Sequence, residues 1–166
     1  DSGYVRINNI TINAMDSDKT CEIRNHLIGF VFQFHHLLPE FNVVENVALP
    51  LLIRGLPKRE AFKAAEKALA DVNFCDRLSA PIIEFSGGER QKIALARALV
   101  TEPLIILADE PTGNLDTYNT EILLELFKKI NSEKKVTIIT VTHNQNLANY
   151  AHQKLFLKNG QLIFVK

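Results

Sequence analysis

The sequence predicts an α/β fold with a mostly parallel central sheet. Two apolar runs, residues 104–109 and 136–142, each end in polar side chains, as is typical of strands inside a parallel sheet. Residues 120–131 lie between them and have the apolar spacing of a helix, which supplies the crossover that parallel strands need. We expect that crossover to be right-handed.

Size and composition fit one domain, or most of one. The chain has 166 residues, of which 46% are apolar, and its 19 basic and 19 acidic side chains balance. This balance argues against a nucleic-acid partner. Cys21 and Cys75 lie far apart, and we expect them to be reduced, packed thiols. The apolar stretches are too short for a transmembrane helix or a signal peptide, so any membrane role must come through a partner.

The first half of the chain alternates short strands and helices. Residues 4–13 predict a hairpin or a kinked strand, and residues 16–25 a polar loop that leads into a short helix. Residues 27–34 predict a buried strand, and residues 43–53 a short helix broken by Pro50. The next helix spans residues 58–73, and steps of three and four place on one face its residues Phe62, Ala65, Leu69 and Val72.

The second half begins with a helix that starts after Ser86 and ends near Val100, because Pro103 cannot continue it. The crossover helix has a buried face made of Ile122, Leu123, Leu126, Phe127 and Ile130. Residues 146–152 predict a short helix. The dipeptide Asn159-Gly160 between two apolar runs predicts a tight hairpin.

The start of the helix after Ser86 has the pattern of a capping box, Ser86 with Glu89. Amides of the first turn still point out of the helix end, where the helix dipole is positive. Gly87 and Gly88 leave the backbone bare, so a large anion can come close. These residues therefore predict a phosphate site, although an ordinary helix cap would use the same pattern.

Asp109 and Glu110 end the first apolar run, at the edge of the sheet where ligands of α/β proteins bind. Asp109 suits a magnesium ion that accompanies a nucleotide, held through water. Glu110 suits the group that positions and deprotonates an attacking water molecule. The alternative is a capping acid pair in a turn.

Three further polar residues follow predicted strands. His143 ends the second apolar run, where its ring can hold a terminal phosphate and the water, although a single His is more often structural. Gln33 can carry a dipole to the metal and the water, or can simply end a strand. Asp116 is either part of the site or a helix N-cap. His35 and His36 are not expected to bind metal, because neighbours on an extended chain point in opposite directions.

These residues resemble the motifs of ATP-binding cassette (ABC) ATPases. Phe85-Ser-Gly-Gly-Glu-Arg-Gln91 resembles the signature motif, with Phe where the family usually has Leu, and residues 104–110 resemble the Walker B strand with its catalytic glutamate. Residues 113–116 resemble the D-loop, Thr142-His143 the switch histidine, and Gln33 the Q-loop glutamine. The resemblance implies ATP and Mg²⁺ as cofactors, with Glu110, His143 and Gln33 catalytic and Asp109 and Gln33 at the metal.

In such a family the sites form at the interface of a head-to-tail homodimer. The resemblance therefore implies that nucleotide on one subunit is contacted by residues of the other, and the matching residues here are Ser86, Gly87, Gly88, Glu89 and Asp116. It also implies that the whole chain is one nucleotide-binding domain, residues 1–166. A helical signature subdomain is expected within it, at about residues 40–100.

The segment after Gln33 narrows the resemblance. Residues 33–41, Gln-Phe-His-His-Leu-Leu-Pro-Glu-Phe, and residues 45–53 are similar to the ATPases of lipoprotein-releasing systems. In the family this segment docks on membrane-spanning subunits. The resemblance thus implies integral membrane partners for the region Gln33–Ile53, and a place on the cytoplasmic face of the inner membrane.

One motif of the family is missing from these residues. None of the seven glycines precedes a lysine in the P-loop pattern G-x-x-x-x-G-K-[ST]. We expect that the chain begins inside the domain, and that residues 1–166 alone are inactive.

Alternatives remain open for the function. One is the ATPase of a related macrolide or peptide exporter, or of a cell-division complex. Another is a fragment that binds membrane subunits without turning over ATP. A DNA-repair or translation ATPase is disfavoured, because the charge is balanced and the sequence has no long coiled-coil insertion or second cassette.

Overall fold

A parallel three-stranded sheet forms the centre of the computed structural model, which describes residues 3–12 and 17–165. Its strands are β3 (Ile28–Phe32), β4 (Ile105–Asp109) and β5 (Thr137–Val141), and β4 lies in the middle. Phe32, Asp109 and Val141 are in register, so the carboxyl ends of all three strands meet at one edge. This arrangement confirms the predicted α/β fold with its parallel sheet.

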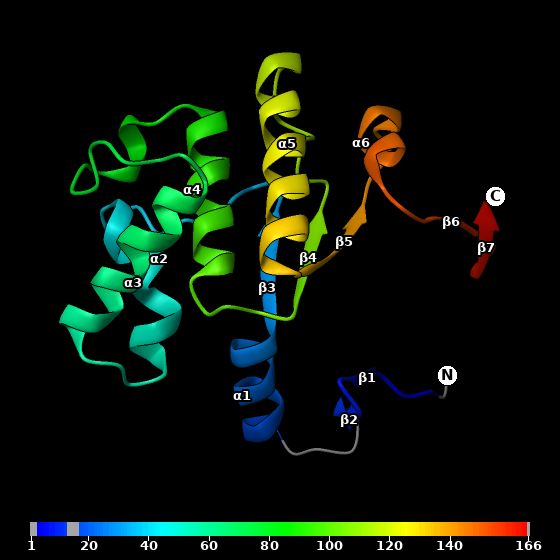
Figure 1. The fold of residues 1–166 in the computed structure, drawn as a ribbon, viewed down its shortest axis with the longest axis horizontal. Helices are drawn as coiled ribbons and strands as arrows, with labels where there is room; N and C mark the ends of the chain where they lie inside the picture. The colour runs from blue at the N-terminus through cyan, green and yellow to red at the C-terminus, as the bar shows by residue number, and fades with distance from the viewer. Residues whose placement is uncertain (1–2, 13–16, 166) are drawn as a thin grey trace.

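The helices surround this sheet unevenly (Figure 1). Three of them, α2, α3 and α4, lie together on one side of the molecule, and α5 runs along the sheet in front of its strands. The helices are α1 (Ser17–Leu27), α2 (Val43–Ile53), α3 (Lys58–Asp71), the 3-10 helix η2 (Ile82–Glu84), α4 (Gly87–Leu99), α5 (Thr117–Lys134) and α6 (Gln145–Tyr150).

Two antiparallel hairpins lie outside the sheet. The first joins β1 (Arg6–Ile7) and β2 (Ile10–Thr11), and the second joins β6 (Lys154–Lys158) and β7 (Gln161–Val165). Asn8 and Asn9 have φ of 46° and 64°, and Asn159 and Gly160 have φ of 50° and 76°. Positive φ at both central residues is the geometry of a two-residue hairpin turn, so both predicted hairpins are confirmed.

The sheet is packed on one face. Gly29 and Val31 of β3 and Ile106 and Ala108 of β4 are buried on the side that carries α4 and α5. A Cβ at Gly29 would lie only 2.5 Å from the carbonyl oxygen of Ala98, so glycine lets α4 approach β3 closely. On the other face Phe30, Ile139 and Val141 are 37%, 51% and 66% exposed. The prediction that residues 136–142 form a buried strand is therefore wrong for β5, where exposed and half-buried residues alternate.

The helices α2, α3 and α4 pack against one another and share one apolar core. Its central side chains are fully buried, among them Val47, Leu69, Ile93 and Leu95. Of the face predicted for α3, Ala65, Leu69 and Val72 are buried and Phe62 is half-buried. This packing supports the helical subdomain proposed for about residues 40–100, whose limits stay a prediction.

Several local predictions need correction. Pro50 does not break α2, which continues to Ile53 because the burial of Val47, Ala48 and Leu51 compensates for the one backbone hydrogen bond that proline cannot make. The strand predicted for residues 27–34 covers only Ile28–Phe32, because α1 extends to Leu27. Residues 13–16, the end of the predicted first hairpin and the start of the predicted loop, lie outside the described residues. Cys21 and Cys75 are free thiols, as predicted, but both are exposed.

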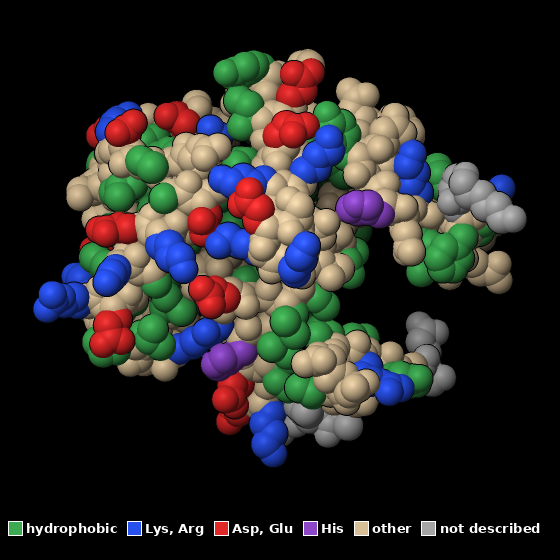
Figure 2. Space-filling view, in the orientation of Figure 1, with side chains coloured by type: hydrophobic (Ala, Val, Ile, Leu, Met, Phe, Trp, Pro, Cys, Tyr) green, Lys and Arg blue, Asp and Glu red, His purple; other side chains and the backbone are tan. Residues whose placement is uncertain are grey.

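Acidic and basic side chains are mixed over the helices on the face seen in Figure 2, while apolar side chains show on the hairpin of β6 and β7. Leu157 and Phe164 of this hairpin are 72% and 75% exposed. None of the helices in residues 3–12 and 17–165 is long and apolar enough to cross a membrane.

The buried side chain of Asn46 holds the loop that leads from β3 to α2. Its Oδ1 accepts from the amide of Leu38 at 2.8 Å, and its Nδ2 donates to the carbonyl oxygens of Leu38, Phe41 and Asn42 at 2.9, 3.0 and 3.1 Å. Asn46 is 0% exposed. One side chain therefore satisfies four backbone groups of this loop.

We predict that Asn46→Ala lowers the free energy of unfolding by about 2 to 4 kcal/mol, because it leaves several backbone groups of the loop unsatisfied in a buried place. Urea unfolding followed by circular dichroism measures the change. Asn146→Ala, the same substitution on the exposed surface of α6, is the matched control. An equal, small loss for both variants would show that Asn46 does not hold the loop.

Candidate functional site

Glu110 lies where β4 ends and links it to the end of β5. Its φ is 44°, in the left-handed region that non-glycine residues rarely adopt, and its amide donates to the carbonyl oxygen of Val141 at 2.9 Å. Its Oε1 accepts from the amide of His143 at 3.0 Å and from His143 Nδ1 at 2.7 Å. Its Oε2 accepts from the Thr142 hydroxyl at 3.1 Å. The two strand ends therefore fix the position of this carboxylate.

Opposing effects act on the pKa of Glu110. Burial acts to raise the pKa, but hydrogen bonds from the His143 ring, the Thr142 hydroxyl and the His143 amide together lower it below its ordinary value. The carboxylate is therefore ionised at neutral pH. Because its folded-state pKa is depressed, the stability that it contributes is present above the unfolded-state pKa and is lost as the pH falls through the folded-state value.

The ring of His143 is more exposed to solvent than the carboxylate of Glu110 to which it is hydrogen-bonded. Its side chain is 83% exposed, against 21% for that of Glu110. Since the Glu110 oxygen can only accept, Nδ1 of His143 carries a hydrogen, and Nε2 is a donor only when the ring is protonated. The ring thus presents Nε2 to solvent, where it could meet a phosphate group.

Gln33 follows β3 and pairs with the turn after β4. Its Nε2 donates to Asn114 Oδ1 at 3.2 Å, and Asn114 Nδ2 donates to the carbonyl oxygen of Gln33 at 3.2 Å. A Cβ at Gly113 would lie 2.7 Å from Gln33 Nε2, so the glycine makes room for this pair. The structure thus brings Gln33 to the same sheet edge as Glu110 and His143.

Asp109 and Gln33 carry oxygen atoms of the kind that the predicted metal would need. Asp109 is exposed at the end of β4, in register with Phe32. The contacts that the structure describes use the amide nitrogen of Gln33, which leaves its oxygen available. Oxygen ligands from one carboxylate and one amide, completed by water and phosphate, fit Mg²⁺. The described residues contain no group of three or more acidic, His or Cys side chains that could hold a metal without such help.

The start of α4 has the predicted capping box. Glu89 Oε2 accepts from the Ser86 amide at 2.8 Å and from the Ser86 hydroxyl at 2.7 Å, and Ser86 Oγ accepts from the Glu89 amide at 3.3 Å. The Ser86 hydroxyl and then its amide lower the pKa of Glu89. Gly87 has open space where a side chain would be, with no atom closer than 3.8 Å to a Cβ built there. The helix start can therefore accept a ligand at Gly87.

Asp116 is the N-cap of α5. Its Oδ1 accepts from the Asn119 amide at 2.7 Å, and both of its oxygens accept from Asn119 Nδ2 at 3.0 Å. The structural alternative that the sequence allowed for Asp116 is thus observed, and a contact with nucleotide stays a prediction.

Arg97, in the last turn of α4, was not among the residues predicted from the sequence. Its two terminal nitrogens donate to the carbonyl oxygens of His36 and His35, each at 2.6 Å, and burial lowers its pKa. His35 is half-buried beside it, and its pKa is lowered by burial and then by Arg90. The hydrogen bonds from Arg97 to His35 and His36 leave no signal in the local sequence, because the partners are about sixty residues apart.

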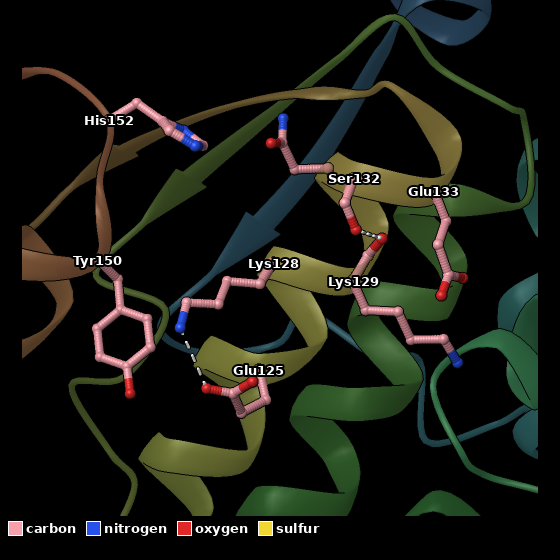
Figure 3. Close-up of a pocket in the computed structure, with 8 residues that line it drawn as sticks. Glu125, Lys128, Lys129, Ser132, Glu133, Tyr150 and His152 are labelled. Atoms are coloured by element: carbon pink, nitrogen blue, oxygen red, sulfur yellow. Dashed lines mark hydrogen bonds and ion pairs between the residues drawn. The ribbon is translucent and has the colours of Figure 1, made fainter.

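A cavity of about 440 Å³ lies between α5 and the end of α6, where Tyr150 and His152 line it (Figure 3). In this cavity Lys128 Nζ forms an ion pair with Glu125 Oε1 at 3.4 Å. The same nitrogen lies 4.3 Å from the centre of the Tyr150 ring. None of the predicted site residues lines the cavity. We place the candidate site at the sheet edge, because there the polar side chains converge at the carboxyl ends of the parallel strands.

Comparisons with known proteins point to one family. The profile of the family described as "ABC transporter" matches residues 1–113. The lipoprotein-releasing system ATP-binding protein LolD of Syntrophus aciditrophicus is 46% identical over 162 residues, which are 98% of this chain and 73% of that protein. LolD of Porphyromonas gingivalis is 48% identical over 98% of this chain and 74% of its own length.

Solved structures agree with this result. The dimer of the ATP-binding cassette MJ0796 bound to ADP and phosphate has a TM-score of 0.85 and 38% identity, covering 97% of this chain and 71% of that chain. The protein cbiO1 of Clostridium perfringens, part of the transporter complex cbiONQ, has a TM-score of 0.86 and 27% identity over 98% of this chain and 64% of its own.

Proposed function

Because this chain belongs to the ABC transporter family and is related to its ATPase subunits, we propose that it powers the release of lipoproteins from the cytoplasmic membrane. The observation that carries the proposal is the Glu110 carboxylate, held at the edge of the sheet by Thr142 and His143. The relatives that support the substrate are named as ATP-binding proteins of lipoprotein-releasing systems.

The position of each polar residue at the sheet edge indicates its role in ATP hydrolysis. Asp109 holds Mg²⁺ through water, with the Gln33 oxygen beside it. Glu110 Oε2 accepts one described hydrogen bond, from Thr142, which leaves room for the attacking water. When both ring nitrogens of His143 carry a hydrogen, Nε2 donates to the terminal phosphate. Together these groups orient water and stabilise charge in phosphoryl transfer.

In this proposal, the nucleotide bound to one subunit contacts the start of α4 in the other subunit. The Ser86 hydroxyl and the amides at Gly87 and Gly88 face the phosphate, and Glu89 orients Ser86. Asp116 lies in the turn next to this interface. The dimeric form of the similar cassette MJ0796 supports a homodimer.

Exposed apolar residues between β3 and α3 suit a membrane-spanning partner. Phe34 and Ile53 are 69% and 71% exposed, and Leu38 and Phe41 are 38% and 37% exposed. Asn46 and Arg97 hold the backbone beneath them. We propose that this region, Gln33–Ile53, contacts integral membrane subunits, which places the chain at the cytoplasmic face of the inner membrane.

The test uses the P-loop-completed protein, defined as this chain joined behind a segment that carries a P-loop. It is assembled with membrane subunits in vesicles that contain a lipid-anchored protein, and ATP-dependent release to a soluble lipoprotein carrier is measured. Release that needs ATP supports the proposal. ATP hydrolysis that is stimulated by peptide or macrolide, without any lipoprotein release, would favour the exporter instead.

Residues 1–166 on their own should show no magnesium-dependent ATPase activity and no binding of ATP at micromolar concentration. Backbone amides and a lysine of the P-loop cradle the β- and γ-phosphates in this class of ATPase, and these residues lack the motif. The few amides at the start of α4 cannot offset the cost of immobilising ATP. Calorimetry with ATP and a phosphate-release assay measure both quantities, with the P-loop-completed protein as the positive control. Saturable micromolar binding would reveal another phosphate cradle.

A further inference from the structure

Of the two glycines at the start of α4, only Gly88 has a neighbouring side chain where its own Cβ would lie. A Cβ at Gly88 would lie 2.3 Å from Asn119 Oδ1, 2.5 Å from its Cγ and 3.1 Å from its Cβ. Real Cβ atoms do not approach other atoms so closely, so the side chain of Asn119 fills the place that a residue 88 side chain would need. Gly88 is buried, whereas a Cβ at Gly87 would meet only the Asn114 carbonyl oxygen, at 3.8 Å.

Backbone conformation does not explain either glycine. Neither has a positive φ, so both positions have backbone angles open to any residue. At Gly88 the contact with Asn119 is the reason for glycine. No atom of the described chain requires a glycine at Gly87, which leaves the space there free for a group outside the chain.

Hydrogen bonds fix the orientation of Asn119. The side-chain Nδ2 of Asn119 donates to both oxygens of Asp116, and its backbone amide donates to Asp116 Oδ1. The Oδ1 of Asn119 therefore turns toward α4 and Gly88. Asp116 closes the turn that begins at Glu110, where the Gly113 amide donates to the Glu110 carbonyl oxygen at 3.0 Å. The turn of residues 110–116, the hydrogen bonds between Asp116 and Asn119, and the packing of Asn119 beside Gly88 therefore connect Glu110 to the start of α4.

We propose that Asn119 is a positioning residue that locks the start of α4 to the turn that carries Glu110. This inference rests on the proposed function, in which Glu110 acts at one ATP site and the start of α4 acts at the other. The contact makes the two half-sites of a subunit move as one body. Closure of the dimer at one site then sets the position of the groups at the second.

The test adds a methyl group at two neighbouring positions of the P-loop-completed protein. Gly88→Ala and the matched control Gly87→Ala are each made alone and together with Asn119→Ala, and Asn119→Ala is also made by itself. Melting temperature, ATP binding to the monomer and kcat are measured. Alanine is a better helix former than glycine, so a fall in melting temperature reports a steric conflict.

We expect Gly88→Ala to lower the melting temperature and to lower kcat about tenfold, with ATP binding to the monomer unchanged. Asn119→Ala should recover most of the lost melting temperature, because it removes the two atoms that lie 2.3 and 2.5 Å away. It should not restore kcat, because it also removes the side chain that joins the start of α4 to the turn, and by itself it should lower kcat. Gly87→Ala should not lower the melting temperature, because a Cβ there meets no atom closer than 3.8 Å, and adding Asn119→Ala should give no recovery in this background.

Three results would overturn the inference. Gly88→Ala could melt like the wild type, or its loss of melting temperature could persist when Asn119→Ala is added, and then Asn119 does not occupy this place. Wild-type kcat in Asn119→Ala, alone or together with Gly88→Ala, would reduce Asn119 to a packing residue. If the wild-type protein itself hydrolyses no ATP, the proposed function fails, while the melting temperatures still decide whether the contact exists.

Discussion

Glu110→Gln in the P-loop-completed protein should lower the rate of ATP hydrolysis by about 10²- to 10⁴-fold, which is the usual contribution of a general base. Glutamine has nearly the size of glutamate and keeps one acceptor, so the hydrogen bonds from His143 to this position can persist. It cannot take a proton from water. ATP should still bind, because neither Asp109 nor the start of α4 is changed.

The closed dimer should therefore accumulate in the presence of ATP. Phosphate release measures the rate, and size-exclusion chromatography with ATP measures the dimer. Glu121→Gln, on the exposed surface of α5, is the matched control and should behave as the wild type. Wild-type turnover of Glu110→Gln would remove Glu110 from the mechanism.

Ser86→Arg should abolish ATP-dependent dimerisation, and hydrolysis with it, while the monomer still binds ATP. The substitution removes the hydroxyl that donates to Glu89 at 2.7 Å, and the loss of this N-cap costs about 1 kcal/mol of stability. The larger effect comes from the volume of the arginine, which blocks the approach of the second subunit at the helix start.

Two variants separate these effects. Ser86→Thr keeps a capping hydroxyl and should dimerise. Ser79→Arg adds the same charge at an exposed position before α4 and should also dimerise. Analytical ultracentrifugation with ATP gives the result, and loss of nucleotide binding by the Ser86→Arg monomer would show that Ser86 serves the site of its own subunit.

Local signals account for the features that could be predicted from the sequence. The capping box of Ser86 and Glu89 needs only residues three apart, and the turn at Asn159-Gly160 needs only two. Asp109 and Glu110 follow an apolar run, and the parallel register then brings them beside the ends of β3 and β5. The sheet edge could therefore be recognised before any contact was known.

Contacts between distant segments could not be predicted in this way. Gln33 pairs with Asn114, and Arg97 holds the backbone at His35, through hydrogen bonds that no periodic pattern specifies. The continuation of α2 through Pro50 also depends on tertiary packing, which outweighs the local preference of proline. The exposure of β5 follows from its place at the edge of the three-stranded sheet. Its apolar sequence does not show whether other elements cover that edge.

The register of the sheet also has a consequence for the order of folding. Ile105 pairs with Thr137 across a single helix, whereas Ile28 pairs with Ile105 across a stretch of chain more than twice as long. Closing the longer loop costs more entropy, so we expect β4, α5 and β5 to associate first and β3 to join them afterwards. Pulse-labelled hydrogen exchange should then protect the β5 amides before those of β3, and the reverse order would contradict this. Gln33, which follows β3, would reach Asn114 only in that last step, so the site would become complete when folding ends.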